Sequence, residues 1–360
     1  MKNCSFQTGL KDGDKLYMVE RELGLLMEYD LDTLSYQILT KLEYNKMLGG
    51  VWAVNNIIKV EDVLFLAFRN HDFLMSYDIN TGNTEIHGED FVGQNGIEKS
   101  LLFKNELWMF PVFTSQKIKV FDVISKQFQT KECLQGYLQT KKYINGEKRI
   151  WFITAIKGIL YFALLNTPYI ITYAVDDEDI QVYETEKNDR ISKVVHDGEQ
   201  FWISFVDNCK IARWDIDKGI QEIIEIKEIK IDDRENPILG VYKRKSILFV
   251  IPTFVPCVYS YKRNGQELSM EHTKDFNRSN PDKKSASFRT FIFRENQLLM
   301  FPFEADRIIV ADLETGELKE RECTLTKQEG ISCGITKEML REGIVEKDWF
   351  SLEDFLKFEM

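Results

Sequence analysis

Short apolar runs separated by polar turns recur along most of this chain. Three segments show the pattern clearly: ELWMFPVFTSQKIKVFDVISKQFQ from Glu106, QFWISFVDNCKIARWDIDKGIQEI from Gln200 and QLLMFPFEADRIIVADLETGELKE from Gln297. Each begins with an apolar strand, passes through a polar hairpin, and continues with a strand that ends at an Asp, a turn and a short last strand. Nothing within residues 1–330 sustains an apolar period of 3.6 residues, so the pattern predicts an all-β structure.

The segments form a repeat that covers nearly the whole chain. Weaker copies begin near residues 15, 63, 159 and 247, and each copy is preceded by one more short strand, such as SFRTFIFREN. The residues that follow the aromatic residue of the third strand are separated by about 47 residues on average, and they are Asp30, Asp78, Asp122, Ala174, Asp215, Lys262 and Asp312. Four-stranded antiparallel units at this spacing are typical of β-propeller blades. Residues 1–330 are therefore predicted to form a seven-bladed β-propeller.

The two ends of the chain lead to separate expectations. SFQTGL, near the N-terminus, is expected to supply the inner strand of the first blade, so the ring should close by packing rather than by strand exchange. Residues 331–360 are predicted to form a short C-terminal helical tail, because Ser351 and Asp354 resemble a capping box before an apolar side. The tail could pack on the propeller or dock a partner.

Composition narrows the possible partners. The chain has 360 residues, of which 44% are hydrophobic, and 47 Lys and Arg stand against 58 Asp and Glu, a net charge of −11. This balance argues against binding to nucleic acid or to an anionic membrane surface. No apolar run approaches the roughly 20 residues of a membrane span, and no signal peptide is evident. The six cysteines form no CxxC pair. We expect a cytoplasmic monomer with free thiols and with no metal or cofactor.

The recurring Asp after the third strand has two interpretations. The carboxylates could form a ring that holds a metal ion. Alternatively, each Asp could begin a turn, and its side chain would then accept hydrogen bonds from backbone N–H groups of that turn. The second interpretation is favoured, because a position that repeats in almost every blade serves the fold.

The blade pattern resembles the Kelch and streptogramin-lyase-like propeller superfamilies. The resemblance rests on strands that end in an aromatic residue and Asp, followed by turns such as DINTGN and DLETGE, and on phrases such as QFWISFVDNCKIARWD. It covers essentially the whole chain and implies the fold. The Gly-Gly pair usual in Kelch blades is absent, and no lyase histidine context surrounds His71, His87, His196 or His272, so the resemblance implies no activity.

Candidate site residues lie on the face that carries the inter-blade links and the hairpins between second and third strands. Long loops on a rigid scaffold commonly carry function. The hairpin RNHD could supply an anion clamp and a carboxylate-oriented base, so the catalytic candidates are Arg69, His71 and Asp72; it could equally be a solvated turn. The ligand-binding candidates, including basic residues that could attract an anion, are Arg69, Asn70, His71, Trp52, Lys99, Arg149 and Arg289.

Three functions remain open from the sequence. The leading hypothesis is a non-enzymatic binding or scaffold protein that recognises a peptide, protein or glycan on this face. The first alternative is a propeller enzyme of lyase, hydrolase or epimerase type with a polar site at the channel mouth. The second is a sensor of a small anionic metabolite. Propeller sites draw side chains from several blades and leave no linear motif, so the sequence does not choose among the three.

Overall fold

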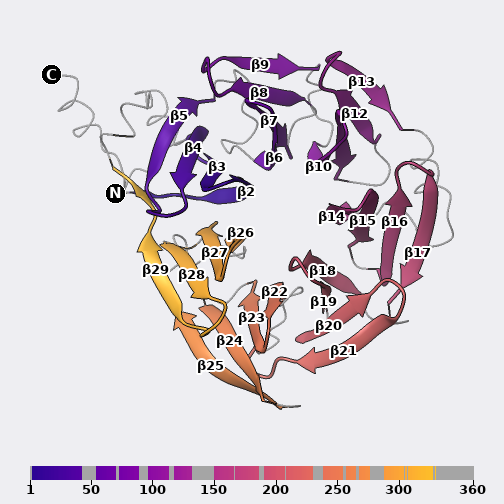
Figure 1. The fold of residues 1–360 in the computed structure, drawn as a ribbon, viewed down its shortest axis with the longest axis vertical. Coiled ribbons are helices and arrows are strands. Elements are labelled where there is room, and N and C mark those ends of the chain that lie inside the picture. The colour runs from indigo at the N-terminus through magenta and orange to yellow at the C-terminus, as the bar shows by residue number, and fades with distance from the viewer. Residues whose placement is uncertain are drawn as a thin grey trace.

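Seven four-stranded antiparallel sheets surround a central channel in the computed structural model of the protein (Figure 1). In each sheet the strands follow one another in sequence order from the channel outwards. This confirms the predicted seven-bladed β-propeller. The structure describes residues 2–42, 54–69, 73–88, 96–112, 117–131, 150–165, 167–185, 190–206, 208–229, 238–253, 257–264, 267–275, 288–303, 305, 307–326 and 329.

The first four blades use strands of four to seven residues. Their bounds are β2 Phe6–Asp12, β3 Lys15–Glu20, β4 Leu25–Asp30 and β5 Tyr36–Lys41; β6 Val54–Val60, β7 Val63–Phe68, β8 Leu74–Asp78 and β9 Thr84–His87; β10 Ile97–Phe103, β11 Glu106–Pro111, β12 Lys119–Asp122 and β13 Gln127–Thr130; β14 Ile150–Ile156, β15 Ile159–Leu164, β16 Tyr169–Ala174 and β17 Asp179–Glu184.

The last three blades have the same topology, and blade 6 has the longest outer strand. Their bounds are β18 Ile191–His196, β19 Phe201–Phe205, β20 Lys210–Asp215 and β21 Gly219–Glu225; β22 Ile238–Arg244, β23 Ile247–Pro252, β24 Cys257–Asn264 and β25 Glu267–Asp275; β26 Phe288–Arg294, β27 Gln297–Pro302, β28 Arg307–Asp312 and β29 Leu318–Glu322.

The hydrophobic core lies between the blades. A cluster of buried apolar side chains fills each junction of neighbouring sheets. Between blades 3 and 4, for example, Trp108 and Phe110 pack with Phe162 and Tyr173. Because both faces of a middle strand are covered in this way, strands such as β11 and β23 are apolar without alternation.

Ring closure combines packing with a short strand pair. Blade 1 is built entirely from residues near the N-terminus and blade 7 from residues near the C-terminus, so no blade exchanges a strand, as predicted. The expectation that packing alone closes the ring is wrong, however. Strand β1 (Lys2–Asn3) pairs with β30 (Thr324–Leu325), and the N–H of Cys4 donates to the carbonyl of Cys323 at 2.9 Å. This backbone ladder joins the segment before blade 1 to the segment after blade 7.

The recurring Asp is the last residue of the third strand and organises the turn that follows. In blade 2, Oδ1 of Asp78 accepts the N–H groups of Asn80 and Thr81, both at 2.9 Å. The same two bonds form at Asp30, Asp122, Asp215 and Asp312. The favoured sequence interpretation is confirmed, since these carboxylates satisfy backbone donors beside their own strand.

These turns predict a measurable acid sensitivity. Backbone hydrogen bonds hold the pKa of Asp30, Asp78, Asp122 and Asp312 below the ordinary value. A lowered native pKa contributes stability that is complete only above about pH 5 and is lost as the pH falls through the native pKa. Replacing all four with Asn should therefore make the free energy of unfolding less dependent on pH between 5 and 3. Urea titrations across this range would test it, and an unchanged slope would contradict it.

Several expectations lie outside the described residues. The predicted helical tail over 331–360, with Ser351 and Asp354, belongs to the part of the chain that the structure does not describe. Among the described residues, no helix is long and apolar enough to cross a membrane.

Candidate ligand site at the mouth of the central channel

The central channel contains a cavity of about 740 Å³. Its walls come from the inner strands of all seven blades, β2, β6, β10, β14, β18, β22 and β26 (Figure 1). This volume is within the range of ligand pockets in proteins. All seven inner strands run in the same direction, so their first residues meet at one end of the channel, beside the hairpins that join second and third strands.

Every inner strand contains a β-bulge near its first residue. In β10 the pairing with β11 shifts between Ile97 and Lys99, which leaves Glu98 as the extra residue. Matching shifts occur in the other six blades. A bulge redirects side chains and is common beside functional sites. The repeated bulge therefore marks this end of the channel as a ring of redirected side chains.

The channel wall is basic, in contrast to the whole protein. Among the described side chains that line the cavity, five are basic and one, Asp12, is acidic. Asp12 forms an ion pair with Lys59 at the far end of the strands. The basic side chains are Lys11, Lys59, Lys99, Lys193 and Arg289. Because the chain as a whole carries a net charge of −11, this local excess is a specific feature of the channel.

Four cations act electrostatically on one carboxyl group where the inner strands begin. We call Arg69, Glu98, Lys99, Lys193 and Arg289 the cationic mouth. Nε of Arg69 lies 3.5 Å from Oε2 of Glu98, and the side chain of Glu98 is only 11% exposed. Burial raises the pKa of Glu98 to about 7, although the four cations act in the opposite direction. Burial therefore has the larger effect on this carboxyl group.

Burial disfavours the charged form of the two lysines of the cationic mouth. Burial lowers the pKa of Lys99, and Glu98 opposes this effect. Burial, followed by repulsion from Arg289 and Lys99, lowers the pKa of Lys193 to about 8. Lys99 and Lys193 come from blades 3 and 5. Ionisable groups whose pKa is shifted by burial beside other charges are common at functional sites.

An aromatic ring fixes one side of the mouth. The guanidinium of Arg289 lies 3.9 Å from the ring centre of Phe303, and that of Arg21 lies 4.0 Å from the same centre. Arg21 also donates to the hydroxyl of Ser5 at 3.3 Å, and this hydroxyl donates to the carbonyl of Phe303 at 2.6 Å. Cation–π contacts of this kind orient a guanidinium without neutralising it.

Three of the residues predicted from the sequence come together in this mouth. Arg69, Lys99 and Arg289 all act on Glu98. Lys99 and Arg289 were expected at the ends of loops, but they lie within strands β10 and β26. The other predicted site residues lie outside the described part of the chain, and they are Trp52, Asn70, His71, Asp72 and Arg149.

The sequence reasoning missed Glu98 and Lys193. Both occupy the second or third place of an inner strand, as do Lys99 and Arg289. Aligning the seven inner strands by their first apolar residue would have revealed them. Glu98 stands at the second place, which other blades fill with Asn55, Ser192 or Leu239, and Lys193 stands at the third place, which other blades fill with Asn56, Gly240 or Thr290.

His87 and His196, two of the described histidines, make local contacts within the protein. His87 is buried, shares a 2.8 Å hydrogen bond with the hydroxyl of Ser76, and packs against Phe121. His196 accepts the N–H of Gly198 at 3.3 Å through Nδ1. In the part of the chain that the structure describes, no group of three or more His, Cys, Asp or Glu could hold a metal ion.

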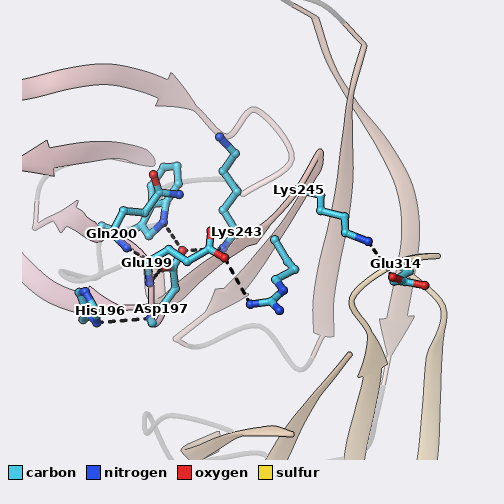
Figure 2. Close-up of polar contacts among 10 residues, drawn as sticks. His196, Asp197, Glu199, Gln200, Lys243, Lys245 and Glu314 are labelled. Carbon is cyan, nitrogen blue, oxygen red and sulfur yellow. Dashed lines mark hydrogen bonds and ion pairs between the residues drawn. The ribbon is translucent and has the colours of Figure 1, made fainter. Parts of the chain in front are cut away.

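The opposite end of the channel has a different polar centre, the buried Asp197 (Figure 2). It lies in the four-residue turn between β18 and β19, where it accepts the N–H groups of Glu199 and Gln200, each at 2.9 Å. Its other oxygen accepts the indole N–H of Trp202 at 2.9 Å and the backbone N–H of Lys243, in blade 6, at 3.2 Å. All its bonds hold protein groups, so we assign Asp197 a structural role.

Comparisons with known proteins agree on architecture. No protein-family model matches the chain, and no curated protein is similar enough in sequence to count as a relative. Among solved structures, the chain is similar to YCF48 bound to D1 peptide (TM-score 0.58, 9% identity, 86% of this chain and 93% of that chain covered). It is also similar to the RRP9 WD40 repeats (TM-score 0.57, 9% identity, 88% and 95% covered).

A third similar structure is an enzyme. It is a catalytically inactive virginiamycin B lyase from Staphylococcus aureus with quinupristin (TM-score 0.53, 13% identity, 76% of this chain and 85% of that chain covered). At these identities the likeness concerns the fold alone. The Kelch likeness expected from the sequence has no counterpart among these three structures. The protein is a seven-bladed β-propeller of the architecture found in WD40 and virginiamycin-lyase structures.

Proposed function

We propose that the protein is a binding propeller that recognises a peptide or protein partner through the cationic mouth and the surrounding face. The observation that carries the proposal is the cavity, which is lined by all seven inner strands and is open to a ring of redirected side chains. A rigid wall of this kind is prepared for binding before the ligand arrives. A propeller with a bound peptide, YCF48, is among the structures of similar fold.

Selection from a peptide display library would test this function, with the full chain as the target. A bulky side chain inside the cavity should then interfere with the selected peptides. Thr154 lines the cavity on β14, so Thr154→Trp should lower their affinity at least tenfold, a loss of about 1.4 kcal/mol or more. Ile124, which is 74% exposed on the outer rim, provides the matched control Ile124→Trp. Equal affinity for both variants would place binding elsewhere.

An enzymatic role of the same mouth is the second candidate. Its support is Glu98, whose pKa near 7 suits a general acid or base, beside the basic Lys193. The two functions differ in what happens to the ligand. A selected peptide that keeps its mass after incubation with stoichiometric protein supports binding. A changed mass, abolished by Glu98→Gln, would support catalysis instead.

A further inference from the structure

Two cysteines face each other where the segment before blade 1 pairs with the segment after blade 7. The ladder of β1 and β30 ends with the pair Asn3 and Thr324. One step further in the same register, Cys4 is opposite Cys323, and the N–H of Cys4 donates to the carbonyl of Cys323 at 2.9 Å. Residues opposed in this way have Cα atoms roughly 5.5 Å apart, a separation that a disulfide bridges without movement of the backbone.

The side chains of the two cysteines meet in the core between blades 1 and 7. They are 1% and 2% exposed and belong to the same cluster of buried side chains. The thiol of Cys4 is hydrogen-bonded to the thiol of Cys323 and to the hydroxyl of Tyr29. The same hydroxyl lies 3.1 Å from Sγ of Cys323. Two sulfur atoms and one hydroxyl therefore converge at this junction.

Blade 1 holds the residues that follow Cys323 in place. The hydroxyl of Tyr36 donates to the carbonyl of Thr324 at 3.0 Å and to Oε1 of Glu329 at 2.9 Å. The ring of Tyr36 also packs against Tyr29, with 5.4 Å between the ring centres. Reacting groups that a fold holds side by side behave as if they were at very high concentration. The two thiols are therefore well placed to react with each other.

We propose that Cys4 and Cys323 are a site of reversible oxidation, at which a disulfide covalently closes the ring of blades. The oxidant is a small disulfide, such as glutathione disulfide. The thiolate of one cysteine attacks this oxidant and releases one small thiol, and the second cysteine then attacks the mixed disulfide and releases the other. The protein loses two electrons and two protons, and the small disulfide gains them as two thiols.

The reduced pair is protected while the junction is closed. The hydrogen bond from Cys323, followed by burial, raises the pKa of Cys4. At neutral pH this residue is therefore a thiol rather than the more reactive thiolate. We expect oxidation to be slow in the folded protein and faster in mild urea, which favours local opening. None of the three groups lines the channel cavity, so the site is independent of the proposed binding function.

Thiol counting on the full chain tests the proposal. The folded protein is kept in a glutathione redox buffer, with urea below the unfolding transition, until its thiol count is constant. Of the six cysteines, two should then resist alkylation under denaturing conditions. Trypsin should release peptides 3–11 and 322–327 joined by a disulfide. Six alkylated cysteines, a glutathione adduct in place of the link, or a link from Cys4 to another cysteine would overturn the proposal.

Serine variants separate this pair from the other cysteines. Cys323→Ser should keep all five remaining thiols open to alkylation in the same buffer. Cys209→Ser is the matched control, because Cys209 is also a buried free thiol, in the core between blades 5 and 6. It should still lose two thiols to the link. Protection of two thiols in Cys323→Ser would show that other cysteines react, and would contradict the proposal.

Oxidation should also stabilise the protein, because the bond restrains more than 300 residues of the unfolded chain. The melting temperature should rise by at least about 3 °C and return to its first value on reduction with dithiothreitol. Hydrogen exchange in β2–β5 and β26–β29 should become slower, since these strands flank the new bond. Cys209→Ser should show both effects and Cys323→Ser neither. An unchanged or lowered melting temperature of the cross-linked protein would refute covalent closure of the ring.

Discussion

Asp197→Ala is expected to lower the free energy of unfolding by roughly 3–5 kcal/mol. The side chain is buried and accepts four hydrogen bonds, two from its own turn, one from the indole of Trp202 and one from the backbone of Lys243 in the next blade. Truncation leaves the indole N–H, which is buried beneath the turn, without an acceptor. Urea unfolding followed by tryptophan fluorescence and by circular dichroism would measure the loss.

Asp215→Ala is a matched control in the same blade. Asp215 also accepts two backbone N–H groups, those of Asp217 and Lys218, but its turn is exposed and water can replace the carboxylate. Its loss should stay below about 1 kcal/mol. A second check uses Trp202→Phe, which removes the orphaned donor. In the Trp202→Phe variant, Asp197→Ala should lower the free energy of unfolding clearly less than in the unmodified protein. Equal losses for Asp197→Ala and Asp215→Ala would show that burial adds nothing.

The blade repeat could be predicted from the sequence because it depends on patterns of residues that are close together in the chain. Apolar middle strands such as LWMFPV and turn-forming residues such as Asp78 are short-range signals, and seven copies reinforce one another. Ring closure was predicted only in part. Strands β1 and β30 have two residues each, too few to give a periodic pattern, and they pair across more than 300 residues. Such pairing depends on the closed ring, which brings the chain ends together.

The candidate site was predictable to a smaller extent. Arg69 was found because it belongs to the polar hairpin RNHD, and Lys99 and Arg289 were found because they are basic residues at the edges of long inter-blade links. Glu98 and Lys193 were missed, since their importance depends on burial and on charges from other blades. Their neighbours in the sequence, Ile97 and Val194, are ordinary strand residues. A charged side chain points to a functional site only when the fold buries it beside other charged side chains.

Tyr29→Ala should destabilise the protein by about 3–5 kcal/mol and, in addition, open the junction between blades 1 and 7. Tyr29 is 1% exposed in the core of this junction, with its ring 5.8 Å from Phe6 and 5.6 Å from Phe301, centre to centre. Its hydroxyl lies 3.1 Å from the sulfur of Cys323, beside the ladder that joins the chain ends. Tyr29→Phe keeps the ring and should lose only about 1 kcal/mol.

Tyr173→Ala separates the effect on the junction from the effect on the core. Tyr173 occupies the same place in blade 4, is equally buried, and packs against Trp108 across the junction of blades 3 and 4. The polypeptide runs directly from blade 3 to blade 4, whereas blade 7 is not followed in the sequence by blade 1. Local opening should therefore be easiest at the junction of blades 7 and 1. In hydrogen exchange at low urea, Tyr29→Ala should accelerate exchange in β2–β5 and β26–β29. Tyr173→Ala should lose similar global stability without this local acceleration. If both variants exchange uniformly around the ring, the junction of the chain ends is no weaker than the others, and the seven blades open as one unit.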